Sequence, residues 1–148
     1  MTTKAELPIS TDLTASLESL SKPVPPMIYL AGPFTSPDPV ENTYKAARLG
    51  TALWEEMKVL PFTPHLFIGW HTICPRPIEF WYDIDLSYID KCDAIIRLPG
   101  TSPGADAEMV YAAEKGIPEV PFEDLPDEIK AIWLNSPYEK VTRTLEKE

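Results

Sequence analysis

The sequence predicts an α/β fold: a single domain with an open, mainly parallel sheet of four to five strands and helices on both faces, Rossmann-like or flavodoxin-like. Apolar runs of strand length alternate with amphipathic segments of helix length. The run at 27–31 is apolar at every position, as in a strand buried on both faces of a parallel sheet. The chain has 148 residues, which is enough for about one domain.

The first half of the fold reads as a strand, a helix and a second strand. Residues 27–31 are an unbroken apolar run that stops at Gly32-Pro33. From Glu41 to Met57 apolar residues recur at helical spacing, which predicts an amphipathic crossover helix. Residues 59–62 predict a short second strand near a sheet edge, and the three elements together form a βαβ unit.

Residues 63–82 combine prolines with many aromatic side chains, and we expect them to form one long loop. A loop of this length in a small domain is more often functional than idle. The remaining elements follow in order: a helix at 83–91, a strand at 94–98, a helix at 105–115 ended by Gly116, a possible fourth strand at 117–122 weakened by Pro118 and Pro121, and a helix at 127–134.

Outside the alternating pattern we expect residues 1–26 to be an extended or partly helical leader, because this segment closes in a run of prolines. Residues 27–148 then form the single α/β domain, with a charged C-terminal tail. No apolar stretch approaches the ~20 residues that span a bilayer, and the start lacks the layout of a signal peptide. We therefore expect a cytoplasmic protein without a membrane partner, in which Cys74 and Cys92 stay thiols.

The charge balance argues against one class of partner. The 13 Lys and Arg residues are scattered, and they face 23 Asp and Glu residues, for a net charge of −10. Such a chain repels the phosphate backbone of a nucleic acid. We expect no DNA or RNA polymer as partner.

In parallel sheets functional groups collect beyond the carboxyl ends of the strands. If strands 27–31 and 94–98 are neighbours, Tyr29, the Gly32 turn and the segment from Ser102 to Glu108 face one crevice. Glu108 lies in the first turns of a helix, where the helix dipole favours an ionised carboxylate that could act as a nucleophile. By position alone, an acidic residue there more commonly serves helix stability.

Three blocks of sequence supply further support. They are Ile28-Tyr29-Leu30-Ala31-Gly32-Pro33, then Asp85-Leu86 ahead of Asp93, then Ser102-Pro103-Gly104-Ala105-Asp106-Ala107-Glu108. In this order the blocks resemble the nucleoside 2-deoxyribosyltransferase-like superfamily. That superfamily includes base-exchanging transferases, hydrolases that remove the base from deoxynucleoside monophosphates, and uncharacterised, often phage-associated relatives. The resemblance covers residues 27 to about 120.

The resemblance implies a role for each motif residue. Glu108 corresponds to the catalytic nucleophile, Tyr29 to the phenol that orients it, and Asp85 to the acidic residue near the sugar and the leaving base, with Asp83 as the other candidate acid. Ser102 matches a position that helps to bind a 5′-phosphate. Further expected substrate contacts are Gly32, Pro33, Phe34, Asp83, Gly104 and Trp81, the aromatic ones as surfaces on which a base stacks.

Each assignment has a structural alternative. Tyr29 could be a core residue, Asp85 a helix N-cap or first-turn residue, Ser102 a helix cap, and the aromatic segment a separate hydrophobic cluster. The loop at 34–38 has no basic residue, unlike several relatives specific for monophosphates, so phosphate binding would depend on hydroxyl groups or on Arg48 or Arg76. The spacing of His65, His71, Cys74, Glu79 and Asp83 matches no metal signature, and we expect no metal and no cofactor.

Taken together, the resemblance implies an enzyme that cleaves or exchanges the N-glycosidic bond of a 2′-deoxyribonucleoside or its 5′-monophosphate, through a covalent Glu108–sugar intermediate. The expected partner is thus a small nucleoside or nucleotide. The family also implies a homo-oligomer. A non-catalytic nucleotide-binding module on the same fold is the alternative.

Overall fold

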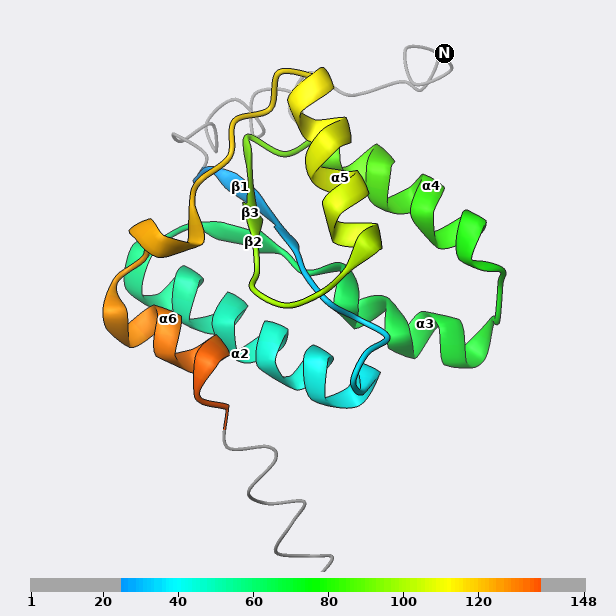
Figure 1. Cartoon of the computed structure of the whole chain (residues 1–148), viewed down its shortest axis with the longest axis horizontal. Helices are drawn as coiled ribbons and strands as arrows, with labels where there is room; N and C mark the ends of the chain where they lie inside the picture. The colour runs from blue at the N-terminus through cyan, green and yellow to red at the C-terminus, as the bar shows by residue number, and fades with distance from the viewer. Residues whose placement is uncertain (1–24, 137–148) are drawn as a thin grey trace, which may run out of the picture.

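The computed structural model describes residues 25–136 and shows a sheet of three parallel strands in the order β2-β1-β3 (Figure 1). The strands are β1 (Met27–Ala31), β2 (Leu60–Phe62) and β3 (Ala94–Arg97). In this register Tyr29 of β1 pairs with Phe62 on one side and with Ile95 on the other. The first and third strands are neighbours, which is the condition that the expected crevice required, so the loops that follow them share one edge of the sheet.

Helices cover both faces of the sheet because side chains alternate along β1. Ile28 and Leu30 enter a core closed by α2 (Pro39–Met57) and α6 (Asp127–Leu134). Tyr29 and Ala31 point the other way, into a second cluster with side chains from α4 (Ile78–Ile89) and α5 (Pro103–Glu114) (Figure 1). Most of β1 and β3 is therefore buried on both sides, whereas β2, at the edge of the sheet, is only partly buried.

The sequence shows why the two long crossover helices begin where they do. Asp38 accepts a hydrogen bond from the Val40 backbone N–H at 3.1 Å and caps α2, with Pro39 in the first turn. Ser102 caps α5 in the same way, accepting from the Ala105 N–H at 3.1 Å. Both helices thus start after a loop at the carboxyl edge of the sheet, and for α5 this brings the first turns to the cavity described below.

The expectation of four to five strands is too high for residues 25–136, where the sheet has three. The predicted fourth strand at 117–122 is reduced to a single bridge between Ile95 and Glu119. Ile95 exchanges two backbone hydrogen bonds with it, donating to the Pro118 carbonyl and accepting from the Val120 N–H. Pro118 and Pro121 have no N–H to donate, so the ladder cannot extend.

The expected loop at 63–82 is wrong as well. Most of this segment is helical: a 3-10 turn η2 (Pro64–Leu66), the helix α3 (Phe67–Ile73), and the first turns of α4, which begins at Ile78 rather than near Asp83. Pro64 stands in the first turn of η2 and Pro77 just before α4. Proline is well tolerated at both places because the first N–H groups of a helix have no partner inside it.

Among residues 25–136 no helix is long and apolar enough to cross a membrane. The predicted leader, apart from its last two residues, and the charged tail beyond residue 136 lie outside the described part of the chain.

Candidate active site

Two loops meet at the carboxyl edge of the sheet, and glycines allow them to approach closely. A Cβ on Gly32, just after β1, would lie 2.8 Å from the Leu98 Cβ, just after β3. A Cβ on Gly100, where φ is +120°, would lie 2.7 Å from the Pro33 ring. Only glycine fits at either place, since real side chains do not tolerate such distances. The two loops are therefore packed together as one wall of the site.

The carboxylate of Glu108 lies behind this wall, in contact with the first strand. The buried residues of α5 are Ala105, Glu108 and Ala112, at the spacing of a helix face that rests on a sheet. Tyr29 is fully buried on β1, and its hydroxyl donates to Glu108 Oε2 at 2.6 Å. The structure thus brings together a phenol and a carboxylate that are 79 positions apart in the sequence.

Burial controls the protonation of this pair. It raises the pKa of Glu108 to about 7, while hydrogen bonding with Tyr29 and Asp85 and the positive charge of Arg97 act in the opposite direction. Burial and the neighbouring carboxylates hold the pKa of Tyr29 well above 10, so its hydroxyl keeps its proton and remains a donor. Near neutral pH the Glu108 carboxylate is therefore poised between its two states, with a fixed donor on one oxygen.

Asp85, on α4, is the second carboxyl group of the site. Burial first, and then the charge of Glu108, raises the pKa of Asp85 to about 8. Desolvation and mutual repulsion make it costly for both groups to ionise, and the pair titrates as a unit. When one of the two groups is ionised, the charge lies on Glu108, because it has the lower pKa and accepts from the Tyr29 hydroxyl, and Asp85 keeps its proton.

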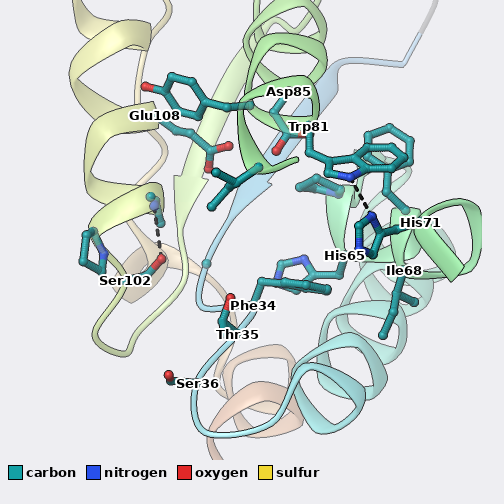
Figure 2. A pocket seen from close by; sticks show the side chains of 18 of the residues that line it. Phe34, Thr35, Ser36, His65, Ile68, His71, Trp81, Asp85, Ser102 and Glu108 are labelled. Carbon is teal, nitrogen blue, oxygen red and sulfur yellow. Dashed lines mark hydrogen bonds between the residues drawn. The ribbon is translucent and has the colours of Figure 1, made fainter. Parts of the chain in front are cut away.

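The carboxyl groups of Glu108 and Asp85 border a cavity of about 580 Å³, a size typical of small-molecule sites (Figure 2). Glu108 and Ser102 lie on the α5 side, and His65, His71 and Trp81 lie across from them (Figure 2). The lining residues are Gly32, Phe34, Thr35, Ser36, Pro64, His65, Phe67, Ile68, His71, Arg76, Ile78, Trp81, Tyr82, Asp85, Thr101, Ser102, Pro103, Gly104, Ala105 and Glu108.

Most of the expected site residues lie around this cavity. Gly32, Phe34, Trp81, Ser102 and Gly104 line it together with Asp85 and Glu108. Ser102 also caps α5, so the structural role considered for it is present as well. Two expected contacts are elsewhere: Asp83 is exposed on α4, and Pro33 is where the two loops pack together, with its carbonyl bonded to His65. Neither is among the lining residues.

His65 is a functional candidate that the sequence analysis considered only as a metal ligand. It is buried, and its Nε2 lies 2.9 Å from the Pro33 carbonyl oxygen. A carbonyl only accepts, so Nε2 carries the proton and Nδ1 keeps a free lone pair. Burial lowers the pKa of His65 to about 4, which keeps the ring neutral. The available signal was its place just after the second strand, at the edge where functional groups collect.

Two buried polar atoms in residues 25–136 have no hydrogen-bond partner, and both belong to residues of this cavity. They are His65 Nδ1 and Asp85 Oδ1. Leaving such an atom unpaired costs about 1–3 kcal/mol, which folding does not incur without a reason. The arrangement fits a polar ligand that supplies a partner to each atom.

The aromatic segment forms the opposite side of the cavity. Trp81 packs against Phe67 with ring centroids 5.7 Å apart and against Trp70 at 5.0 Å. Of the two arginines considered for phosphate binding, Arg76 lines the cavity. Arg48 is exposed on α2, over the Tyr44 ring. Within the described residues no three His, Cys, Asp or Glu side chains are grouped in a way that could hold a metal ion.

Comparison with known families, curated proteins and solved structures gives no match. The fold and the site define a class: an α/β protein with a carboxylate pair in a pocket at the carboxyl edge of a parallel sheet. Within that class, the resemblance to the 2-deoxyribosyltransferase-like superfamily rests on the three sequence blocks.

Proposed function

We propose that this protein cleaves or exchanges the N-glycosidic bond of a 2′-deoxyribonucleoside or its 5′-monophosphate. The observation that carries the proposal is the 2.6 Å hydrogen bond from the Tyr29 hydroxyl to Glu108 Oε2, at the edge of a cavity that Asp85 shares. Glycosidic cleavage needs a carboxylate of fixed orientation as the nucleophile and a second carboxyl group of raised pKa as the general acid.

In the first step Glu108 attacks the anomeric carbon. Breaking the bond to the base builds positive charge on the sugar, and the adjacent anion stabilises it and forms an ester with C1′. Tyr29 holds one carboxylate oxygen, leaving the other for the sugar. The departing base takes the bonding electrons and needs a proton, which Asp85 can donate because its pKa of about 8 keeps it protonated at neutral pH.

In the second step the ester is broken. A water molecule gives free deoxyribose or its phosphate, whereas a second base gives an exchanged nucleoside. In either case Asp85, now ionised, takes the proton of the incoming group, and Glu108 leaves as the carboxylate. The same two residues therefore serve both a hydrolase and a transferase.

The cavity suits a nucleoside in its polarity as well as in its size. One side carries the carboxyl groups together with Ser102 and Gly104 at the start of α5, and the other carries the aromatic rings. Sugars bind through directed hydrogen bonds and bases through stacking. A nucleoside that spans the cavity would place its sugar against the carboxyl groups and the start of α5, and its base against the aromatic rings.

The direct test is to incubate the protein with deoxynucleosides and deoxynucleotides, with and without an acceptor base, and to separate the products by chromatography. We expect free base from the hydrolase and exchanged base from the transferase. Glu108→Gln should abolish product, whereas Glu114→Gln, the same change at an exposed position of the same helix, should not. Saturable ligand binding without any product would favour the non-catalytic binding module instead.

A homo-oligomer is part of the same proposal. Ile73 at the end of α3 and Ile78 at the start of α4 have 81% and 78% of their surface exposed, more than any other large apolar residue of 25–136. Large apolar side chains exposed to this degree favour a protein contact. Light scattering coupled to gel filtration should give a mass above one chain, and a charged substitution at Ile73, which does not line the cavity, should reduce it. A monomeric mass for the full chain would contradict this part.

A further inference from the structure

The hydrogen bonds of His71 determine which of its ring nitrogens carries the proton. His71 lies near the end of α3, and its Nδ1 accepts from the Trp81 indole N–H at 2.8 Å and from the Arg76 backbone N–H at 3.3 Å. Both partners are donors only, so Nδ1 must present its lone pair. The neutral ring therefore carries its hydrogen on Nε2.

The protonated nitrogen belongs to a residue of the cavity wall. His71 lines the cavity on the side opposite Glu108 and Ser102, with the indole of Trp81 beside it (Figure 2). Nothing in residues 25–136 forms a hydrogen bond with its Nε2. The result is a neutral N–H donor at the pocket, on a ring whose tautomer a neighbouring residue sets.

The surroundings of His71 restrict the ligand group that it could meet. Its ring packs edge to face against Trp81 at 5.5 Å, and Trp81 in turn packs against Phe67 at 5.7 Å. Flat apolar rings with a single neutral donor among them match an aromatic heterocycle that carries an acceptor at its edge. They match a sugar or a phosphate less well, since these need several polar partners or a positive charge, and the Arg76 guanidinium on this side donates to the Pro75 carbonyl and lies over the Phe80 ring.

We propose that His71 is a specificity-determining residue whose Nε2–H donates to a carbonyl oxygen or ring nitrogen of the ligand's heterocycle, with Trp81 as the residue that positions it. This inference rests on the proposed function, in which the heterocycle is the nucleobase. It also gives Trp81 a role beyond stacking, since the indole N–H holds the lone pair of His71 away from the ligand.

The first test reads the tautomer and needs no ligand. Long-range ¹H–¹⁵N NMR of the full chain should show His71 with its proton on Nε2. Trp81→Phe, which removes the indole N–H, should move the two ring ¹⁵N shifts toward each other as the other tautomer becomes populated. Trp70→Phe is the matched control, because Trp70 packs on Trp81 but does not line the cavity. A proton on Nδ1 in the wild type would overturn the proposal.

The second test reads recognition by calorimetry, with deoxynucleoside 5′-monophosphates and with 2-deoxyribose 5-phosphate, which has no base. His71→Leu should weaken binding of the nucleotides about five- to tenfold, the range of one lost hydrogen bond. His71→Gln, which keeps an N–H donor, should recover most of it. Binding of the sugar phosphate should not change.

The outcomes separate this inference from the proposed function. Unchanged nucleotide affinity in His71→Leu, while the wild type still releases base, would overturn the role of His71 and leave the glycosidic chemistry in place. Equal weakening for the nucleotides and the sugar phosphate would contradict a contact with the base. A wild type that neither binds nor cleaves any nucleotide would refute both proposals.

Discussion

Arg97 and Asp106 form an ion pair in which Nε and Nη2 of the guanidinium both reach Asp106 Oδ1, at 3.0 and 2.9 Å. The same guanidinium donates to the carbonyls of Leu98, Gly100 and Ser102. Arg97 ends β3 and Asp106 lies in the first turn of α5, so the side chain spans the loop between them. It holds the segment that supplies Thr101 and Ser102 to the pocket.

The first prediction separates the ion pair with Asp106 from the hydrogen bonds that Arg97 donates to the loop carbonyls. The Asp106 side chain is 70% exposed and that of Arg97 is 20% exposed. Exposed ion pairs contribute little, whereas carbonyls that lose a charged donor lose more. Asp106→Asn should lower the free energy of unfolding by about 0.5 kcal/mol, and Arg97→Met by about 1–3 kcal/mol. Urea titration measures both, and equal losses would show that the ion pair dominates.

The second prediction concerns the phenol. Tyr29→Phe removes the hydroxyl that donates to Glu108 and leaves a buried carboxylate oxygen without that partner, at a cost of about 1–3 kcal/mol in stability. The lost bond also favoured the ionised form, so the pKa of Glu108 should rise. The acidic limb of the activity profile should therefore move to higher pH. Tyr111→Phe removes an exposed hydroxyl bonded to Asp90 and should leave that limb in place.

The structure also shows which parts of the fold the sequence could predict. Residues 27–31 form a strand as expected because an apolar run bounded by Gly and Pro leaves few alternatives. Residues 63–82 were misassigned because proline signals both loops and helix starts, and local sequence does not distinguish them. The expected strand at 117–122 is reduced to one bridge for a related reason. Pro118 and Pro121 lack the backbone N–H groups that a strand donates, and an apolar pattern does not show this loss.

Some residues of the candidate site could be predicted from the sequence, and others could not. Glu108 and Asp85 could be named because the three sequence blocks resemble those of a known superfamily, whereas position alone favoured a structural role for each. The role of His65 depends on the Pro33 carbonyl, 32 positions away, and that of His71 on the indole of Trp81. Such roles arise only when tertiary contacts set a tautomer, which composition and spacing do not encode.

The third prediction is a narrow bell-shaped pH profile. The proposed reaction requires Glu108 ionised and Asp85 protonated, so kcat/KM should rise with pH through about 7 and fall through about 8. Because the two groups interact, these limbs belong to the pair rather than to single residues. Asp85→Asn should remove the basic limb and lower kcat. A flat profile between pH 5 and 9 would contradict the assignment of these roles.

The fourth prediction links Glu108 to stability. Its pKa rises from 4.5 to about 7 on folding, so the folded state binds this proton more tightly than the unfolded chain does. Stability is then lost as pH increases from about 4.5 to about 7. Glu108→Gln has no such proton and keeps an oxygen for Tyr29. Its stability relative to wild type should increase by about 3 kcal/mol between pH 4 and pH 8.

Thermal unfolding at the two pH values measures this difference. The exposed Glu114 provides the control, since Glu114→Gln should show the same small effect at both. If Glu108→Gln gains nothing at the higher pH, the carboxylate ionises without cost, and the buried environment assigned to it is wrong.

The last prediction uses two glycines of the site that differ in their surroundings. At Gly32 an added Cβ meets Leu98 atoms at 2.8 and 2.9 Å, so Gly32→Ala must push apart the loops after β1 and β3. At Gly104 an added Cβ meets nothing within 4 Å, although the residue lines the cavity in the first turn of α5. Overpacking at Gly32 should cost about 1–3 kcal/mol, whereas Gly104→Ala should leave stability equal or slightly higher because alanine favours a helix.

The two variants should differ in the opposite order when ligand binding is measured: the variant that keeps its stability should lose more affinity. Gly104→Ala narrows the cavity without disturbing the fold, so its KM for a deoxynucleotide should increase while its melting temperature holds. Gly32→Ala should mainly lower the melting temperature. Its KM should increase only to the extent that the two loops move apart. If Gly104→Ala binds and turns over every deoxynucleotide as the wild type does, the ligand does not approach the start of α5, and the placement of the sugar against that helix is wrong.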